Sequence, residues 1–301
     1  IPSPISRYLH FAPHWFHKFG TGWNHFIELI VPWFSFGPRT ACHVAGVLLV
    51  SFQLLLIISG NLSFLNYVTI IPFLACFDDT FWRKILPNRL IRRADRPDSI
   101  PQLALVQQIV VLILAATVIW LSRNPVMNLV SSRQAMNTSF DPLELVNTYG
   151  AFGVVGRERN EIIFEGTTDE MITGDTQWRP YEFKAKPGDP DRRPPFIAPY
   201  QPRIDWQIWF AAMSSPSDYP WTLHFVWRLL HNDAGTLSLL ANNPFPDTPP
   251  KYIRARLYRY RFAPLGQKSW WIREPAGEWL PALSTDDSEF RRFLAAMNWL
   301  D

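Results

Sequence analysis

The hydrophobic pattern of the chain changes near residue 122. Residues 1–122 contain long uninterrupted apolar runs, whereas residues 123–301 mix apolar and polar positions at the periods of helices and strands. The runs Cys42–Gly60 and Ala104–Ser122 each extend over nineteen residues without Asp, Glu, Lys or Arg, close to the ~20 that cross a bilayer. We therefore expect a membrane α-helical region at 1–122, followed by a soluble α+β domain with an antiparallel β-sheet at 123–301.

A third apolar segment is less clear. Leu62–Phe77 has only sixteen residues and contains Asn66 and Pro72, so it is either a tilted or broken span or a re-entrant segment. With it, the expected spans lie near 42–60, 62–77 and 104–122. Asn24–Phe36 is shorter again, which favours the end of a helix or an interfacial segment.

Orientation follows from charge. Six basic residues crowd into the segment 78–101, namely Arg83, Lys84, Arg89, Arg92, Arg93 and Arg96. Short basic loops stay on the cytoplasmic side of a membrane. The last span then carries residues 123–301 to the opposite side, which is the lumen of the endoplasmic reticulum in a eukaryote and the cell exterior in a bacterium.

The soluble part shows the hydrophobic periods of both strands and helices. Strands are expected at 157–165, 178–184, 252–262, 269–273 and 278–283. Helices are expected at 205–213, 220–231 and 286–298. Lys186–Arg203 contains six prolines, which predicts an extended segment on the domain surface.

The strand expected at 252–262 changes phase in its middle. One face carries Ile253, Ala255 and Leu257, and the other carries Tyr258, Tyr260 and Phe262. Either a bulge at Leu257/Tyr258 brings the two sets of apolar side chains onto the same face, or both faces of the strand are half buried.

Local signals suggest how the helices begin. Asp205 and Asp218 stand where helix N-caps are expected, and Ser284 with Asp287 is similar to a capping box. The first helix would present Trp206, Trp209, Phe210 and Met213 along one face, and the last Phe290, Phe293, Leu294 and Met297. Tryptophan-rich faces of this kind most often belong to the core, with a partner-binding groove as the alternative.

Charge and cysteine content limit the possible functions. Residues 1–122 have nine Lys/Arg and five Asp/Glu, and residues 123–301 have twenty and twenty-one. Without a domain-wide basic excess, nucleic acid is not an expected partner. The cysteines Cys42 and Cys76 both lie in apolar runs, so the soluble part has neither a disulfide nor a thiolate metal site.

No motif for catalysis or for a cofactor occurs. GxSxG, P-loop and HExxH patterns are absent from the sequence, and His224 and His231 alone are too few for a zinc site. We therefore expect no catalytic residues, no metal and no cofactor.

Polar groups near the apolar runs are further candidates. His25 and Glu28 are spaced i, i+3, so they share a helix face and are intramembrane candidates by default. A mutual ion pair, or contact of Glu28 with interfacial water, is the simpler alternative. Asp78 and Asp79 are expected to pair with neighbouring arginines.

Two glycosylation sequons are present. Asn137-Thr138-Ser139 lies on the expected non-cytoplasmic side and is a glycosylation candidate. Asn61-Leu62-Ser63 also matches but lies very close to the membrane.

Several long blocks resemble one known family in the same order. They are LVNTYGAFGVVGRERNEIIFEGT (145–167), RPYEFKAKPGDPDRRPPFIAPYQPRIDWQIWFAAM (179–213), YPWTLHFVWRLLHND (219–233), LLANNPFPDTPPKYIRARLYRYRF (239–262), NHFIELIVPWF (24–34) and ISGNLSFLNYVTIIPFLACFDD (58–79). The first four resemble the C-terminal domain of the lipase maturation factor family, and the last two its membrane region. That family carries further membrane helices upstream, and this chain begins Ile1-Pro2-Ser3-Pro4 without a signal-peptide pattern. We therefore expect a fragment lacking those helices.

The resemblance implies a function. Members of the family in the endoplasmic reticulum are membrane-anchored, chaperone-like factors that help secreted lipases fold and assemble. The implied partners are the lipid bilayer and a client lipase or other secreted protein. A factor of this kind needs an exposed surface for its client rather than a catalytic group. Client-binding candidates are aromatic or basic residues in or beside the proline-rich segment: Trp178, Tyr181, Tyr200, Arg203, Trp206 and Trp209.

Two alternatives differ in class. The membrane region is distantly similar to that of vitamin K-dependent carboxylases, so the chain could be a membrane-embedded enzyme with His25, Glu28 and His43 as remnants of an active site. It could also be a membrane protein that binds a partner of another kind. The location would be the endoplasmic reticulum membrane in a eukaryote and the plasma membrane in a bacterium.

Overall fold

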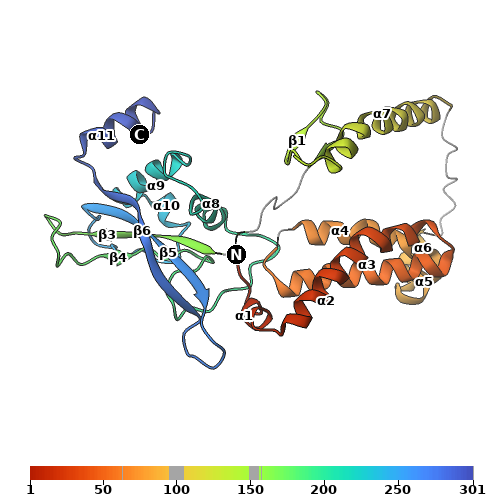
Figure 1. Cartoon of the computed structure of the whole chain (residues 1–301), viewed down its shortest axis with the longest axis horizontal. Helices are drawn as coiled ribbons and strands as arrows, with labels where there is room; N and C mark the ends of the chain where they lie inside the picture. The colour runs from red at the N-terminus through yellow and green to blue at the C-terminus, as the bar shows by residue number, and fades with distance from the viewer. Residues whose placement is uncertain (63, 95–104, 149–155, 157, 301) are drawn as a thin grey trace. The chain divides into compact units, whose positions relative to one another are not determined.

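The chain folds into two compact units. The computed structural model describes residues 1–62, 64–94, 105–148, 156 and 158–300. One unit combines Ile1–Lys84 with Glu158–Asp301, and the other is Ile85–Arg157. The first unit holds a helical region and an α+β domain (Figure 1).

Helices make up all the regular structure of residues 1–84 in the described part of the chain. They are α1 (Ser6–His10), α2 (His14–His25), the π-helical turn η1 (Phe26–Ile30), the 3₁₀ turn η2 (Val31–Phe36), α3 (Arg39–Ser59), α4 (Leu65–Phe73), the 3₁₀ turn η3 (Leu74–Cys76) and α5 (Asp79–Ile85, which ends one residue into the second unit). Pro38 stands directly before α3 and Gly60 directly after it, the positions where these residues commonly mark helix ends. With 21 residues, α3 is about 31 Å long at ~1.5 Å per residue.

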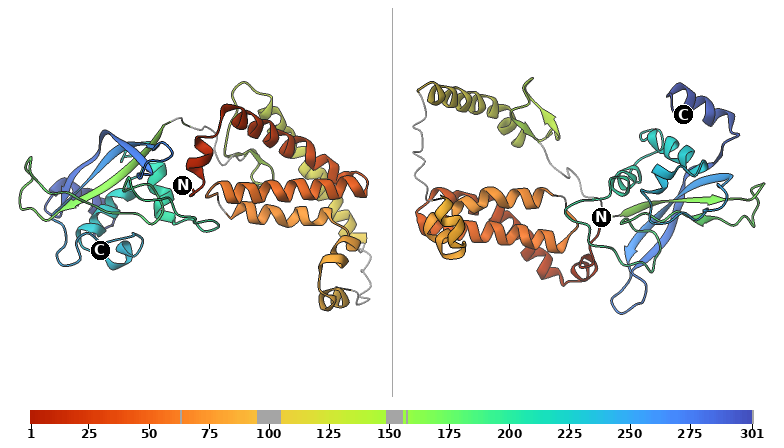
Figure 2. Two further views of the ribbon diagram at one scale, coloured as in Figure 1. Left: turned by 90° about the horizontal axis from the view of Figure 1, so that it is seen from below. Right: turned by 180° about the vertical axis from the view of Figure 1, so that it is seen from behind.

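The helices α3 and α4 lie side by side (Figure 2). Asn66 donates from its side-chain amide to Gln53 Oε1 at 2.8 Å and ties the two helices together. Gly46 allows close packing, because a Cβ there would lie 2.8 Å from the Phe77 ring. In the segment expected at 62–77, the structure has an apolar helical stretch, Leu65–Cys76, that is shorter than α3. Pro72 lies inside its first part, α4.

The second unit contains the other long apolar helix. It holds α6 (Asn88–Ala94), α7 (Leu105–Leu129) and a two-stranded pairing of β1 (Thr138–Ser139) with β2 (Asn147–Thr148). Within the described residues, α3 and α7 are long and apolar enough to cross a membrane. These two helices match the runs expected at 42–60 and 104–122.

The α+β domain is built on a four-stranded antiparallel sheet of order β4-β3-β5-β6. Its strands are β3 (Arg159–Thr167), β4 (Arg179–Pro180), β5 (Tyr252–Phe262) and β6 (Trp271–Ser284). Its helices are α8 (Arg203–Ala211), α9 (Trp221–Leu230), α10 (Ala234–Leu237) and α11 (Ser288–Ala296). The main core joins α8, α9 and α11 to one face of the sheet. The predicted fold class, a membrane helical region followed by an antiparallel α+β domain, is confirmed.

The phase change in β5 is resolved by burying both faces of the strand. β3 pairs with β5 without interruption from Arg159↔Tyr260 to Thr167↔Tyr252. A register shift does occur at Leu257/Tyr258, but it lies between β5 and β6, and the extra residue is on β6. The alternation of β5 is therefore unbroken, and the strand contributes to a core on each side.

The two cores differ in size. Ile253 and Ala255 belong to the main core under the helices. Tyr260 joins Ile163 and Trp271 in a smaller cluster on the opposite face. There the Tyr260 hydroxyl donates to Gly188 O at 2.6 Å, so the proline-rich segment covers that end of the sheet.

The prediction of two strands at 269–273 and 278–283 is wrong. β6 runs continuously from Trp271 to Ser284 through Pro275-Ala276-Gly277. Gly277 has a φ of 140°, and shifts in the register absorb the extra residues. A proline is tolerated because β6 is an edge strand, where one side of the backbone needs no ladder partner.

The strand expected at 178–184 is reduced to the two residues of β4 and a single bridge between Phe183 and Leu240. Beyond it, the ammonium group of Lys186 donates to Ile162 O on β3 at 2.9 Å. A side chain thus occupies the position at the edge of β3 where a longer strand would have paired.

None of the three predicted helix caps agrees with the structure. α8 begins after Pro202, with Asp205 inside its first turn, and Pro220 rather than Asp218 is the N-cap of α9. Asp218 instead accepts hydrogen bonds from Ser214 and Ser215. The capping box expected for Ser284 and Asp287 is wrong as well, because Asp287 rather than Ser284 is the N-cap of α11 and accepts from the backbone N–H groups of residues 289 and 290. Phe290 and Leu294 of α11 are buried, whereas Met297, directly after the helix, is exposed.

Candidate functional site

The six client-binding candidates differ in exposure. Tyr200 is 83% exposed and Arg203 is exposed, whereas Trp178, Trp206 and Trp209 are half-buried. Tyr181 is only 1% exposed, so its assignment to an exposed surface is corrected. Its ring packs against Phe245, and burial raises the pKa of its hydroxyl. The strand β4 turns this residue inward toward the core.

The aromatic face of α8 is not its core face. The core side carries Ile208 and Ala211, both 0% exposed. Trp206, Trp209 and Phe210 instead form their own half-buried group, with ring centroids 5.1–5.4 Å apart. The expectation that this tryptophan face belongs to the core is therefore wrong, because the smaller Ile208 and Ala211 bring α8 close to the sheet.

Trp178 lies on the other side of the sheet. Its ring stacks 4.0 Å from the guanidinium carbon of Arg254, which donates two hydrogen bonds to Glu165 Oε2, at 2.8 and 2.9 Å. Strand alternation places Glu165 on the face opposite Phe164, which belongs to the core under the helices. The candidates therefore form two separate surfaces, one around α8 and one around Trp178.

An open groove of about 390 Å³ lies beside α8. Its lining residues are Arg203, Ile204, Gln207, Trp221 and Leu239. Leu239 is 45% exposed. The groove combines an apolar floor with one cation and one amide, a composition suited to an extended peptide segment. We use the name α8 surface for two parts of the exposed surface of this helix: the groove, and the neighbouring pair Trp206 and Trp209, which do not line it.

Buried charges position the α8 surface. Asp205, 0% exposed, accepts the backbone N–H groups of Ala185 and Lys186 at 2.6 and 2.8 Å. Lys186, 1% exposed, places its ammonium group 3.3 Å from Glu161 Oε2 on β3. These contacts connect the start of the proline-rich segment to α8 and to the sheet. Sequence reasoning missed them, since only the tertiary fold brings these charges together.

Two polar side chains join the helical region to the α+β domain. Asn61 donates to Pro195 O at 2.8 Å and accepts from the backbone N–H of Ile197 at 2.9 Å. Arg7 donates from Nε to Ala263 O at 2.9 Å and from Nη2 to Gln267 O at 3.3 Å. Both residues are buried. The sequence contained a signal only for Asn61, which had appeared as a sequon.

The two intramembrane candidates do not form the expected pair. His25 Nδ1 lies 2.8 Å from Thr21 O, and Glu28 accepts from the amide of Asn24 at 3.1 Å. Both side chains are exposed, and the helix changes to π-helical geometry between them. His43 lies elsewhere, near Asp78. The three residues proposed as remnants of an active site are therefore not shown to share one site.

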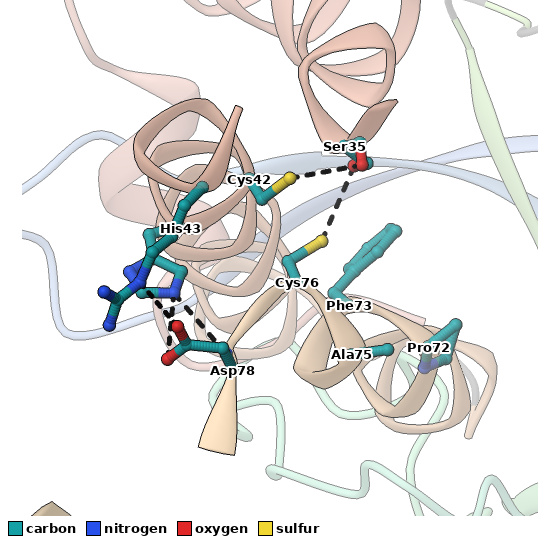
Figure 3. A pocket seen from close by; sticks show the side chains of 9 residues that line it. Ser35, Cys42, His43, Pro72, Phe73, Ala75, Cys76 and Asp78 are labelled. Atoms are coloured by element: carbon teal, nitrogen blue, oxygen red, sulfur yellow. Dashed lines mark hydrogen bonds and ion pairs between the residues drawn. The ribbon is translucent and has the colours of Figure 1, made fainter. Parts of the chain in front are cut away.

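A pocket of about 570 Å³ is present at the N-terminal end of α3 (Figure 3). Arg39 Nε lies 2.5 Å from Asp78 Oδ2, and His43 Nε2 lies 3.5 Å from Asp78 Oδ1. Hydrogen bonds from the Thr80 hydroxyl and the Phe81 N–H, helped by Arg39, lower the pKa of Asp78 to about 2. Asp78 thus pairs with Arg39, the first residue of α3.

Both cysteines reach this pocket. Cys42 donates to Ser35 O at 3.3 Å, and Cys76 lies 3.5 Å from the Ser35 hydroxyl (Figure 3). Both thiols are free. Across the described ranges, no group of three or more His, Cys, Asp or Glu side chains could hold a metal ion.

The two sequons lie in contrasting surroundings. Asn137 is exposed and precedes the short strand β1. Asn61 is 2% exposed, with both amide hydrogens donated, to Pro2 O and Pro195 O. Its nitrogen is not available to a glycan in this fold.

The arrangement defines a class of protein. An apolar helical region is connected by specific hydrogen bonds to an antiparallel α+β domain with an open surface groove. Comparison with protein families gives a specific match: residues 1–84 match the lipase maturation factor transmembrane domain and residues 145–281 match the lipase maturation factor C-terminal domain. The chain belongs to the lipase maturation factor family.

Named relatives agree. The chain is 45% identical to lipase maturation factor 1 of Bos taurus and 46% identical to that of Mus musculus, in each case over 99% of its length. It is 29% identical to lipase maturation factor 2 of Xenopus laevis over 95% of its length. The chain spans about half the length of these relatives, 55–56%. No solved structure matches it.

Proposed function

We propose that this chain is the anchoring and client-binding part of a membrane maturation factor that helps secreted lipases fold and assemble. The observation that carries the proposal is the ordered match of both family domains, with relatives named lipase maturation factor along nearly the whole chain. The work is done by binding: the α+β domain holds an incompletely folded client, and the helical region keeps it at the membrane. In a eukaryote the location is the endoplasmic reticulum membrane, with the domain in the lumen.

The contacts at the two ends of α3 support this orientation. Its first residue, Arg39, pairs with Asp78, where the basic segment 78–101 begins. Its last residue, Ser59, accepts a hydrogen bond from Ser3, and Asn61 then contacts the α+β domain. Asp78, at the start of the basic segment, and the α+β domain therefore contact opposite ends of one membrane-length helix. Since short basic loops are cytoplasmic, this places the domain on the other side, in agreement with the orientation that the same basic segment and the span near 104–122 predict.

The α8 surface is the proposed client site. It offers half-buried tryptophan rings, an apolar groove and Arg203, the mixture of aromatic and arginine side chains that protein interfaces favour. The surface is also rigidly supported, because buried Asp205 attaches the first turn of α8 to the proline-rich segment. Trp178 is excluded from this site by its position on the other face of the sheet.

The test is lipase rescue. A secreted dimeric lipase is expressed in cells that lack their own maturation factor, with the full chain or a variant, and both secreted activity and lipase captured with the factor are measured. Trp209→Ala and Leu239→Asp should reduce both readouts. Trp178→Ala is the matched control, a tryptophan on the opposite face, and should reduce neither. Protease resistance of each variant confirms that it is folded.

The same assay separates binding from catalysis. His224→Ala and Glu28→Gln should leave rescue near normal, because a client-holding surface needs no proton-transferring group. A folded His224→Ala or Glu28→Gln protein that captures lipase but yields no active enzyme would contradict the proposal and favour a membrane enzyme.

A further inference from the structure

The segment from Pro195 to Gln201 has exposed aromatic side chains although it lies next to the end of a membrane helix. Phe196 is 52% exposed and Tyr200 is 83% exposed. Neither side chain contributes to the main core under the helices. Exposed apolar groups that gather in one place, rather than single ones, commonly mark a contact with another molecule or with lipid.

Asn61 determines where this segment lies. It follows Ser59, the last residue of α3, by two positions. Its side chain contacts Pro195 O and Ile197 N, at 2.8 and 2.9 Å. Phe196 stands between these two contacts, and Gln201 donates back to Asn61 O. The aromatic segment is therefore attached directly to the end of α3.

The length of α3 indicates where this attached segment lies relative to the bilayer. Its 21 residues give about 31 Å, which matches the ~30 Å hydrocarbon thickness of a bilayer. When α3 spans the membrane, Ser59 lies at the hydrocarbon boundary and Asn61 in the headgroup layer. Phe196, next to Asn61, is then at the same level. Tyrosine and tryptophan concentrate in this layer because an apolar ring carries a polar O–H or N–H group, as Tyr200 does, and the apolar ring of Phe196 can enter the adjoining hydrocarbon.

A second segment brings aromatic groups to the same level. Ser3 donates to Ser59 O at 3.0 Å, and Pro2 O accepts from Asn61 at 2.8 Å. The short helix α1 follows, and its Tyr8 is 56% exposed, with Phe11 directly after it at 40%. Two parts of the chain that are far apart in sequence thus place exposed rings around the end of one helix.

We propose that the segment Pro195–Gln201 is a membrane-interface loop, with Phe196 and Tyr200 seated among the lipid headgroups on the non-cytoplasmic side and Asn61 as its attachment point. The inference depends on the proposed membrane anchoring by α3. It adds that the α+β domain contacts the bilayer surface directly, beside the start of α8. A client held on the α8 surface would then be kept close to the membrane.

The experiment measures depth in the lipid with no client present. The full chain with Cys42→Ser and Cys76→Ser is labelled with an environment-sensitive fluorophore at Phe196→Cys or Tyr200→Cys and placed in phosphatidylcholine vesicles containing brominated lipid. Both positions should show blue-shifted emission and strong quenching. A label at Met171→Cys is the water-exposed control. Residue 171 is exposed and follows the end of β3 that is far from the β5–β6 turn, and that turn is where Arg7 joins the domain to the helical region. This label should be quenched several-fold less.

A label at Val47→Cys on α3 separates the two possible failures. Quenching at residue 47 without quenching at 196 would overturn the interface loop and leave the anchor intact. Absence of quenching at both would overturn the anchor itself. If residue 196 is open to water in vesicles and becomes protected only when lipase is added, the segment is a client site and the inference is wrong.

Two further measurements keep the test decisive. Asn61→Ala should reduce quenching at residue 196, whereas Asn66→Ala, which removes an amide contact inside the helical region, should not. Equal quenching at residue 196 in the Asn61→Ala and Asn66→Ala proteins would refute the role of Asn61. If the cysteine-free protein does not fold, a photo-crosslinking phenylalanine analogue at 196 in the wild-type chain should label phospholipid, and labelling of water-exposed partners alone would contradict the proposal.

Discussion

The α+β domain and the helical region bury their apolar residues to very different extents. In the domain, Phe164, Ile208 and Leu229 are all 0% exposed within one continuous core. Only 28% of the most apolar stretch of α3 is buried. The corresponding stretch of α7 is not buried at all among the described residues. The domain therefore buries its own apolar core away from water, whereas the long helices leave most of their apolar side chains exposed.

This difference shows what kind of solvent each region requires. Val47, Leu55 and Ile58 of α3 are more than half exposed, at 52%, 57% and 54%. Exposing side chains of this size to water costs roughly 1.5–3 kcal/mol each, so the helical region needs lipid or further helices around it. Core substitutions in the domain should accordingly reduce stability far more than surface substitutions in the helices.

Phe164→Ala should have the largest effect. Phe164 packs against Phe225, Phe183 and Trp279, with ring centroids 5.2, 6.3 and 6.5 Å away. Truncating a buried phenylalanine leaves a cavity, so the free energy of unfolding should fall by about 3–5 kcal/mol. Thermal unfolding and protease resistance of the full chain in detergent measure it.

The matched change is Leu112→Ala in α7, where the side chain is 68% exposed. It should change stability by less than about 0.5 kcal/mol. Equal losses for the two substitutions would contradict the contrast between the regions.

Lys186→Met should come next. It leaves the carboxylate of Glu161 buried without its ammonium partner, although Arg159 remains at 2.7 Å. Breaking a buried ion pair costs roughly 3–5 kcal/mol, and the remaining arginine places this case near about 3. Denaturant unfolding of the full chain gives the value.

The double variant Glu161→Gln with Lys186→Met should regain part of this loss, since the buried carboxylate of Glu161 is then removed, although half-buried Arg159 loses its partner. Arg261→Met is the control at an exposed pair, Arg261–Glu274, with an expected cost below about 1 kcal/mol. A Lys186→Met protein as stable as wild type would show that the buried pair does not support the α8 surface.

A smaller, pH-dependent effect is expected from His224. Partial burial, followed by the charge of Arg228, lowers the pKa of this imidazole. The unfolded chain therefore binds the proton more readily than the folded one just below pH ~6.5. Stability of the domain should fall as the pH drops from about 7 to 5.

His224→Gln should flatten this slope. Arg228 Nε donates to His224 Nε2 at 3.2 Å, an acceptor that protonation removes. Thermal unfolding at pH 5, 6, 7 and 8 tests the effect, and near pH 8 the titration contributes nothing because the imidazole is neutral in both states. An unchanged slope in the variant would assign the pH dependence to other groups.

The smallest effect on stability should accompany loss of a glycan. In microsomes, Asn137 should be glycosylated because it is exposed, and Asn61 should not be because its amide is donated within the fold. Asn137→Gln should remove one glycan, seen as a mass shift, while stability changes by less than about 0.5 kcal/mol. A glycan on Asn61 would contradict its role in joining the two regions, and an unmodified Asn137 would count against the lumenal location.

The predictions that succeeded depend on local pattern. The uncharged runs of α3 and α7 identify themselves by composition, and the period of Tyr252–Phe262 identifies β5 with both of its ends.

The predictions that failed concern segments whose partners lie far away in sequence. Asp205 looked like a helix cap but accepts from residues 185 and 186 instead. The candidate site shows the same limit. Exposed Tyr200 and buried Tyr181 both lie in or beside the proline-rich segment, and only packing against Phe245 distinguishes the second. The Arg39–His43–Asp78 contacts join residues 35 or more positions apart, although the i, i+4 spacing of Arg39 and His43 was visible.

The sequence by itself determined the family, the apolar helices, the antiparallel strand β5 and the basic segment that predicts orientation. Each of these depends on composition or on short-range periodicity, which a single chain carries in full. The tertiary structure decided that β6 is continuous, that α8 turns its tryptophans away from the core, and that Asn61 and Arg7 attach the domain to the helical region. Those outcomes depend on which distant groups satisfy each hydrogen bond and fill each space, and only the folded chain brings those groups together.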